Sequence, residues 1–325
     1  MSGSFFFHFW YFLGFTIFSQ DFYIIMIAWS EKSFYNGSRN RKRKGESYMP
    51  STYAHYRMGQ EVKEKLRGEE RRIIAAHSEL YLIGLHGPDI FFYYKPLRIH
   101  PVNQIGYGTH GRAGAEFFER AAQVIEKHKD TEEREAYLAY VYGVICHFAL
   151  DVTCHGYIDR RIEESGITHT EIEVEFDREL MLVDGLDPLR QELTGHIVPS
   201  LENAKVIKEF YPAATVEQVQ ESLESMIFHN HLLITPSKGK RWLVCALLKA
   251  TGNYKEMHGL MVNYEKNPDC EMSTKNLSGL YQNAKELAIR LILEYGDYLE
   301  NKKPLDEIYR YTFGTKEPEK EEKAG

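Results

Sequence analysis

The sequence predicts an all-α protein built as a single multi-helix domain, from about residue 49 to about residue 313. Over this range, apolar residues recur at the spacing of three and four that places them on one face of a helix. Alternating runs of β-branched residues bounded by hairpin turns, which would indicate strands, are scarce. With 43% hydrophobic residues in 325, the chain can bury a substantial core.

The first helices are predicted from spacing and stop signals. Residues 69–85 carry apolar side chains on one face, and Pro88 ends the pattern. Residues 111–129 show the same periodicity. Residues 133–158 are apolar on more than one face, as a buried central helix would be. Residues 170–182 follow, with Thr168 as the expected N-cap.

Three further amphipathic helices are expected over residues 216–233, 240–262 and 275–299. Together, residues 185–313 should complete the helical wrapping and supply part of a pocket wall. The charged end of the chain, residues 314–325 with the string KEPEKEEK at 316–323, reads as a solvated tail.

Composition excludes several classes of protein. The 40 basic and 47 acidic residues leave a net charge of −7, which argues against holding nucleic acid by bulk charge. A charged fraction of 27% and a mean hydropathy of −0.44 exclude a polytopic membrane protein and a disordered chain. Four cysteines in this length do not make a disulfide framework.

Residues 1–48 form a separate apolar and basic segment. An aromatic run at 5–29 is long enough to span a bilayer, and the basic run at 39–44 would keep the rest of the chain cytoplasmic. Alternatively, residues 43–46 translate a purine-rich ribosome-binding site, and the natural chain starts at Met49. The expected location is therefore cytoplasmic, or the cytoplasmic face of the membrane if residues 1–48 are genuine.

Two short stretches contain the densest set of metal-ligand side chains. His147, Asp151 and His155 follow each other at i, i+4 and i+8, so they share one stripe of a helix. His169 and Glu173 repeat the i, i+4 pattern at the start of the next predicted helix. Either motif alone would also fit a core histidine or an ion pair. Together, on consecutive apolar helices, they favour a metal site, because so many buried charges need a cation.

Three more candidates, His55, Asp89 and His110, lie on predicted loops or helix edges, where functional groups concentrate. Imidazole and carboxylate ligands suit Zn²⁺. Cys146 and Cys154 lie on an adjacent stripe of the helix and leave a structural zinc with soft ligands open, although the carboxylates favour the harder site.

In this order, the motifs resemble those of the zinc-dependent bacterial phospholipases C, all-helical enzymes that share a fold with fungal zinc nucleases. The resemblance covers about residues 49–180 and implies a trinuclear zinc site. By this resemblance Asp89, His110, His147 and Asp151 would hold one zinc, His155, His169 and Glu173 a second, and His55 with bridging Asp151 a third. His100 is a less favoured substitute for His110.

Two departures from the family pattern bear on the third zinc. The family uses the amine and carbonyl of an amino-terminal Trp, whereas here Met49 lies six residues before His55 and the nearest upstream Trp is Trp29. The gap between Asp151 and His155 is also shorter than in the best-known members. Two or three zinc ions are therefore expected.

The resemblance implies hydrolysis of phosphodiester bonds in phospholipid headgroups, with Asp89 orienting or deprotonating the attacking water. Phospholipid or another phosphodiester is the expected partner, with association at a membrane surface. The aromatic string 91–94 could line a lipid pocket or simply pack between helices. The alternatives are a zinc phosphodiesterase or nuclease acting on another substrate, and a metal-stabilised helical protein without catalysis. No basic stripe with interleaved aromatics lies near the candidate site, which disfavours nucleic acid.

Overall fold

The computed structural model describes residues 52–96, 99–252, 254 and 258–314, which belong to one compact unit. The predictions for residues 1–48 and for the tail at 316–323 lie outside the described residues.

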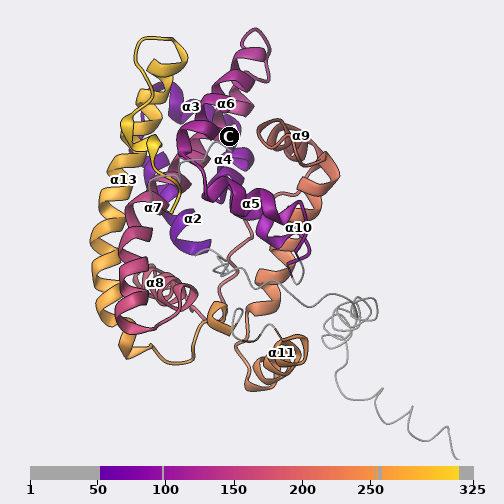
Figure 1. Ribbon diagram of the computed structural model, residues 1–325, viewed down its shortest axis with the longest axis vertical. Coiled ribbons are helices and arrows are strands. Elements are labelled where there is room, and N and C mark those ends of the chain that lie inside the picture. The colour runs from indigo at the N-terminus through magenta and orange to yellow at the C-terminus, as the bar shows by residue number, and fades with distance from the viewer. Residues whose placement is uncertain (1–51, 97–98, 253, 255–257, 315–325) are drawn as a thin grey trace, which may run out of the picture. The chain divides into compact units, whose positions relative to one another are not determined.

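The all-α prediction is confirmed, because the described residues form helices and no strands, with one isolated antiparallel bridge between Ala113 and Thr312. Figure 1 shows the arrangement of the helices with their labels. The α-helices are α2 (Thr52–Lys65), α3 (Gly68–Ala76), α4 (Ser78–Gly84), α5 (Asn103–His110), α6 (Gly114–Lys127), α7 (Arg134–Ser165), α8 (His169–Val183), α9 (Leu201–Phe210), α10 (Val216–Leu233), α11 (Lys238–Thr251) and α13 (Glu271–Leu299). Short 3-10 helices are η2 (Gly87–Tyr93), η3 (His258–Leu260), η4 (Pro268–Cys270) and η5 (Glu307–Arg310).

The centre of the domain is α7, a helix of 32 residues that is buried over most of its length. It packs mainly against α13 and α4, and α2 and α8 also contact it. Its apolar window is long enough to cross a membrane by length and composition, but 94% of that window is buried inside the domain. This burial explains why its apolar residues cover more than one face.

A close contact between two glycines lets α4 lie against α7. A Cβ atom on Gly143 of α7 would lie 2.3 Å from the backbone oxygen of Tyr81. A Cβ atom on Gly84 of α4 would lie 2.3 Å from the backbone oxygen of Tyr140. The two helices therefore approach at a distance that no larger residue permits at either position.

Several helix boundaries differ from those predicted. The helix expected over residues 69–85 is two helices, α3 and α4, which meet at the non-helical residue His77. In the predicted pattern, the consecutive apolar positions Ile74 and Leu80 are six residues apart, and the break lies between them. The helix expected over 240–262 ends at Thr251, where Gly252 takes a left-handed conformation with φ of 78°.

Other predicted helices are confirmed, one of them with a greater length than expected. The helix at 216–233 has the predicted bounds, and Thr168 caps α8 by accepting a hydrogen bond from the backbone N–H of Glu171. The central helix extends to Ser165 rather than stopping at residue 158. The first helix, α2, was not predicted, although Ala54, Met58 and Val62 repeat at intervals of four and are buried.

Candidate metal centre

One stripe of α7 supplies the middle of the candidate metal centre. His147, Asp151 and His155 stand one helical turn apart, and each is at most 7% exposed. Because α7 is held on several sides by other helices, these side chains are carried by a rigid element. This fixed stripe is the frame onto which the other residues converge.

Four other elements bring the remaining candidates to this stripe. His169 and Glu173 lie in the first two turns of α8, and His55 lies in the first turn of α2. Asp89 lies in η2, and His110 is the last residue of α5. The structure therefore brings together all eight side chains that the sequence analysis singled out. They form three groups whose ligand atoms lie within 4.8 Å of one another: His55, His147 and Asp151; Asp89, His110 and His147; His155, His169 and Glu173.

The distances within these groups match the spacing of ligands around a shared cation. Two atoms bound to zinc at about 2.0–2.1 Å and separated by the tetrahedral angle lie about 3.3–3.4 Å apart. His147 Nε2 lies 3.2 Å from Asp151 Oδ2, and His55 Nε2 lies 3.3 Å from Asp151 Oδ1. In the third group, Glu173 Oε1 lies 3.1 Å from Nε2 of His169 and 3.5 Å from Nε2 of His155.

Asp151 occupies the middle of the arrangement. Its Oδ2 atom faces His147 and His110, the latter at 3.7 Å, while its Oδ1 atom faces His55 and, at 3.8 Å, His155. One carboxylate thus contacts histidines from all three groups. This is the geometry that a bridging ligand requires.

Several buried polar atoms at the centre have no hydrogen-bond partner. Both ring nitrogens of His147 lack one, as do Asp89 Oδ1 and Glu173 Oε2. His147 Nε2 lies close to two carboxylates without making a hydrogen bond to either. Burying such atoms unpaired is costly, and cation binding would remove that cost. The mixture of imidazole and carboxylate donors suits zinc, so the residues present fit the metal.

The electrostatics favour the ligand forms of the central residues. Burial lowers the pKa of His147 to about 4, so its imidazole is neutral at physiological pH. Burial works against ionising Asp151, but its four histidine neighbours outweigh this and hold its pKa well below the usual range. The pKa of Glu173 falls to about 2 for the same reason. Neutral imidazole and ionised carboxylate are the forms that bind a cation.

Despite burial, neighbouring carboxylates raise the pKa of two other candidate ligands, one on α5 and one at the end of the α7 stripe. Burial lowers the pKa of His110, but Asp89 and Asp151 outweigh it and raise that pKa to about 10. The pKa of His155 rises to about 9, because Asp151 and Glu173 likewise outweigh burial. A cation bound at these positions must displace protons, which makes metal binding dependent on pH.

The grouping differs in detail from the one that the sequence predicted. His147 is shared between the first and the second groups, so His55 is grouped with His147 as well as with Asp151. The ring of His100 contacts the ring of Tyr94 and accepts a hydrogen bond from the backbone N–H of Val102, and His100 belongs to none of the groups. The buried thiols of Cys146 and Cys154 also lie outside them.

Sequence reasoning missed two features next to the centre. Asp177 of α8 caps the N-terminus of α2 and so holds the turn that carries His55. It lies four residues after Glu173, on the stripe already identified, and that spacing was the available signal. His86 and His196 form a second feature: their Nε2 atoms lie 2.7 Å apart. Nothing in the sequence relates these two residues, which are 110 positions apart.

Comparison with known proteins agrees with this geometry. A family model described as zinc dependent phospholipase C matches residues 54–223, just over half of the chain. No curated protein and no solved structure matches the chain. The matched range begins one residue before His55, ends within α10 and contains all eight candidate ligands.

Proposed function

This chain belongs to the zinc-dependent phospholipase C family, and we propose that it hydrolyses the phosphodiester bond of phospholipid headgroups at the eight-residue centre. The observation that carries the proposal is the position of Asp151, whose two oxygens face histidines of all three groups. A carboxylate in that position would join the groups into a single centre able to hold two or three zinc ions.

Zinc and the residues around it would have separate roles in the hydrolysis. Bound zinc would neutralise charge on the phosphate oxygens and lower the pKa of a water molecule. Asp89 is the candidate to orient that water or accept its proton, because its buried Oδ1 has no hydrogen-bond partner and lies 3.0 Å from His110 Nε2. His110 is the more exposed member of the pair, with 14% of its side chain accessible against 2% for Asp89.

Metal content and hydrolysis should be measured together on the full chain. The purified protein is expected to contain two or three zinc ions and to cleave phosphatidylcholine. Hydrolysis should be lost on chelation and restored by added zinc. Asp151→Asn keeps the size of the side chain but removes the bridging charge, so it should reduce both zinc content and activity. A surface variant such as Asp187→Asn, which alters an exposed carboxylate far from the stripe in sequence, should change neither.

The outcomes separate the alternatives. Cleavage of a chromogenic phosphodiester or single-stranded DNA, with no cleavage of phosphatidylcholine, would keep the metal chemistry but replace the substrate. Tight zinc binding without turnover on any of the three substrates would instead indicate a metal-stabilised helical protein. If Asp151→Asn retains full zinc content, the assigned centre is wrong.

A further inference from the structure

The helix α11 is amphipathic and presents a large aromatic side chain to solvent. Trp242, the one tryptophan among the described residues, is 72% exposed. The opposite side of the helix is anchored, since Val244 and Leu248 are buried against the domain. Lys238 and Lys249 are exposed on the same helix. Trp and Lys on the exposed face of an amphipathic helix are typical of segments that lie in a membrane interface.

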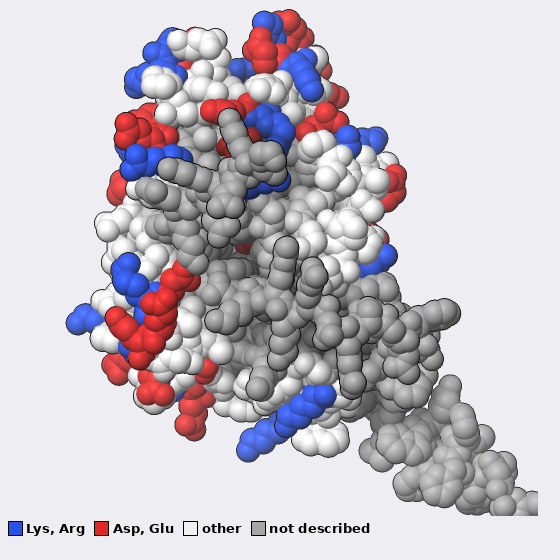
Figure 2. Space-filling model, viewed as in Figure 1, with Lys and Arg blue, Asp and Glu red and all other residues white. Residues whose placement is uncertain are grey.

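The charge of this region is opposite to that of the whole chain. Residues 225–255 contain no Asp or Glu and five Lys or Arg, in a protein with a net charge of −7. In Figure 2 the surface over α11, at the lower edge of the view, is blue and white without red. A local basic surface on an acidic protein favours an anionic partner, because nearby charges dominate over distant screened ones.

The orientation of α11 is fixed by Arg241. Its guanidinium donates hydrogen bonds to the backbone oxygen of Val262, at 2.6 Å, and to the side chain of Asn263, and it lies over the ring of Tyr264. Arg241 is therefore used to hold the helix, while the lysines remain toward solvent. With the inner face held in this way, Trp242 projects outward without any rearrangement.

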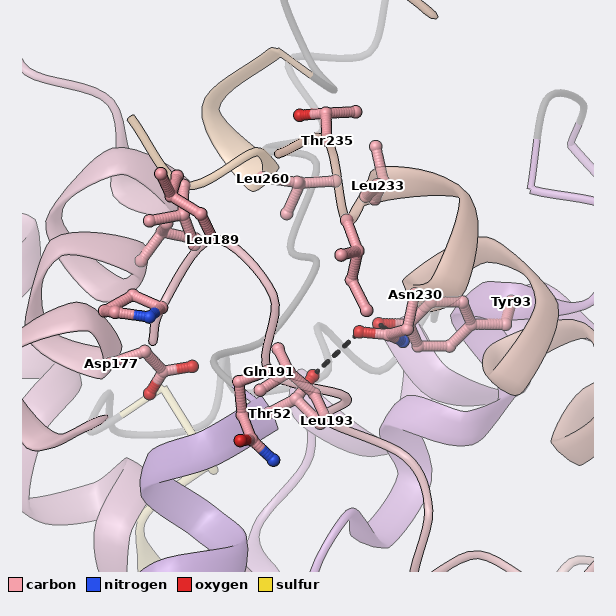
Figure 3. A pocket seen from close by; sticks show the side chains of 14 residues that line it. Thr52, Tyr93, Asp177, Leu189, Gln191, Leu193, Asn230, Leu233, Thr235 and Leu260 are labelled. Atoms are coloured by element: carbon pink, nitrogen blue, oxygen red, sulfur yellow. Dashed lines mark hydrogen bonds between the residues drawn. The ribbon is translucent and has the colours of Figure 1, made fainter. Parts of the chain in front are cut away.

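Residues on either side of α11 in the sequence line a pocket that also includes the first residue of α2. Residues 233–235, which lead into α11, and Leu260 and Val262, which follow it, line one wall. Thr52, the first residue of α2, and Asp177 line the other, and Figure 3 shows their side chains beside the pocket. Thr52 lies three residues before His55. The segments before and after α11 therefore connect the helix, along the chain, to a pocket whose wall lies three residues from a candidate ligand.

We propose that α11 docks this protein on a bilayer surface that contains anionic phospholipid, with Trp242 inserted among the headgroups and Lys238 and Lys249 paired with their phosphates. This inference rests on the proposed function, because it assigns the surface on which the enzyme meets its lipid. The occupant follows from charge complementarity together with the exposed tryptophan: a soluble polyanion without aromatic rings would use the lysines but not the indole, and the net charge of −7 disfavours a nucleic acid.

The test is vesicle cosedimentation of the full-length, zinc-loaded protein with phosphatidylglycerol or phosphatidylcholine vesicles. The wild type should bind phosphatidylglycerol more tightly, and added salt should weaken that binding. Trp242→Ala should weaken binding about tenfold, since a buried aromatic contributes on that scale. Lys238→Gln with Lys249→Gln should weaken it by about fivefold for each lysine, and mainly at low salt. Hydrolysis of a soluble phosphodiester should stay unchanged in both variants.

Matched controls exist on other faces of the domain. Leu293→Ala removes a side chain that is 47% exposed on α13, and Lys302→Gln with Lys303→Gln removes two exposed lysines. Neither should change vesicle binding. Equal binding by wild type and Trp242→Ala would overturn the proposal. So would single-stranded DNA binding that is tighter than vesicle binding and needs the lysines, or a dimer that Trp242→Ala dissociates.

The docking proposal and the proposed function fail in different ways. Vesicle binding that depends on Trp242, without turnover of any phosphodiester, would keep the docking surface and remove the hydrolase assignment. If soluble and vesicle substrates are hydrolysed and Trp242→Ala has no effect on vesicle binding, the hydrolase assignment is kept and the docking surface is wrong.

Discussion

Asp177 on α8 accepts a hydrogen bond of 3.0 Å from the backbone N–H of Tyr53, in the first turn of α2. Its other carboxylate oxygen accepts a bond of 2.8 Å from the backbone N–H of Ala54. His55 is the next residue. A single buried carboxylate therefore caps α2 and sets the position of a candidate ligand, on the same helix that carries His169 and Glu173.

Replacing Asp177 with Asn should weaken the His55 side of the metal centre without removing any ligand. The amide can accept only through its oxygen, and its NH₂ group would face a backbone donor. We expect about 10- to 100-fold weaker affinity for the zinc ion nearest His55, as for other residues that orient ligands. Zinc titration followed by measurement of bound metal checks this, apart from activity.

The matched control is Asp184→Asn. Asp184, the residue after α8, is another carboxylate that binds α2. It accepts hydrogen bonds from the Tyr53 hydroxyl and the Arg57 guanidinium, and not from the backbone before His55. This variant should keep the zinc affinity of the wild type. If Asp177→Asn also keeps the zinc affinity of the wild type, the cap does not position His55.

The fold class could be predicted because it depends on local pattern. The spacing of apolar residues gave α10 with its observed bounds, and the all-round apolar character of residues 133–158 correctly indicated a central helix. The boundary errors arose where backbone conformation rather than hydrophobicity decides, as at His77 and Gly252. Periodicity reports which face is buried, not where the backbone leaves the helix.

The candidate site could be predicted only in part, for a related reason. His147, Asp151 and His155 share a helix, so their spacing alone places them together. The placement of Asp89 and His110 beside them depends on how η2 and α5 fold back toward α7, which no local pattern reports. The family resemblance supplied those positions. It did not indicate the contact between His86 and His196, which joins two separate segments.

The contact between His86 and His196 should make stability depend on pH. Burial lowers the pKa of His196 to about 4, and burial with the neighbouring His196 lowers the pKa of His86 well below its ordinary value. Both are neutral in the folded protein, so the unfolded chain binds more protons below its pKa of about 6.5. Stability is therefore lost as the pH falls from about 6.5 toward about 4, by up to about 1.4 kcal/mol per pH unit for each proton.

His196→Gln removes one of the two titrating imidazoles and tests the predicted direction of the pH dependence of stability. Urea unfolding of zinc-loaded wild type and variant should show a shallower loss of stability for the variant between about pH 6.5 and pH 4. Because both proteins keep the same metal ligands, the metal's own pH dependence is common to the two curves. Parallel curves across this range would exclude His196 as a contributor.

Two glycine substitutions should have opposite effects on the free energy of unfolding. Gly143→Ala places a methyl group 2.3 Å from the backbone oxygen of Tyr81, in the contact between α7 and α4. The helices must separate to accept it, and we expect a loss of about 3 kcal/mol or more, because backbone cannot move as a side chain can. Gly279→Ala on α13 meets nothing within 4 Å and should stabilise the protein by about 0.5–1 kcal/mol through helix propensity.

Urea unfolding of the two variants beside the wild type measures both effects under one set of conditions. The pair separates close packing from helix propensity, since the same chemical change is made in the middle of two long helices. A stabilised Gly143→Ala protein would mean that α4 and α7 do not meet through Gly84 and Gly143. The stripe of ligands on α7 would then lack the support that α4 gives it, and zinc content measured on the same variant would show whether the metal centre depends on that contact.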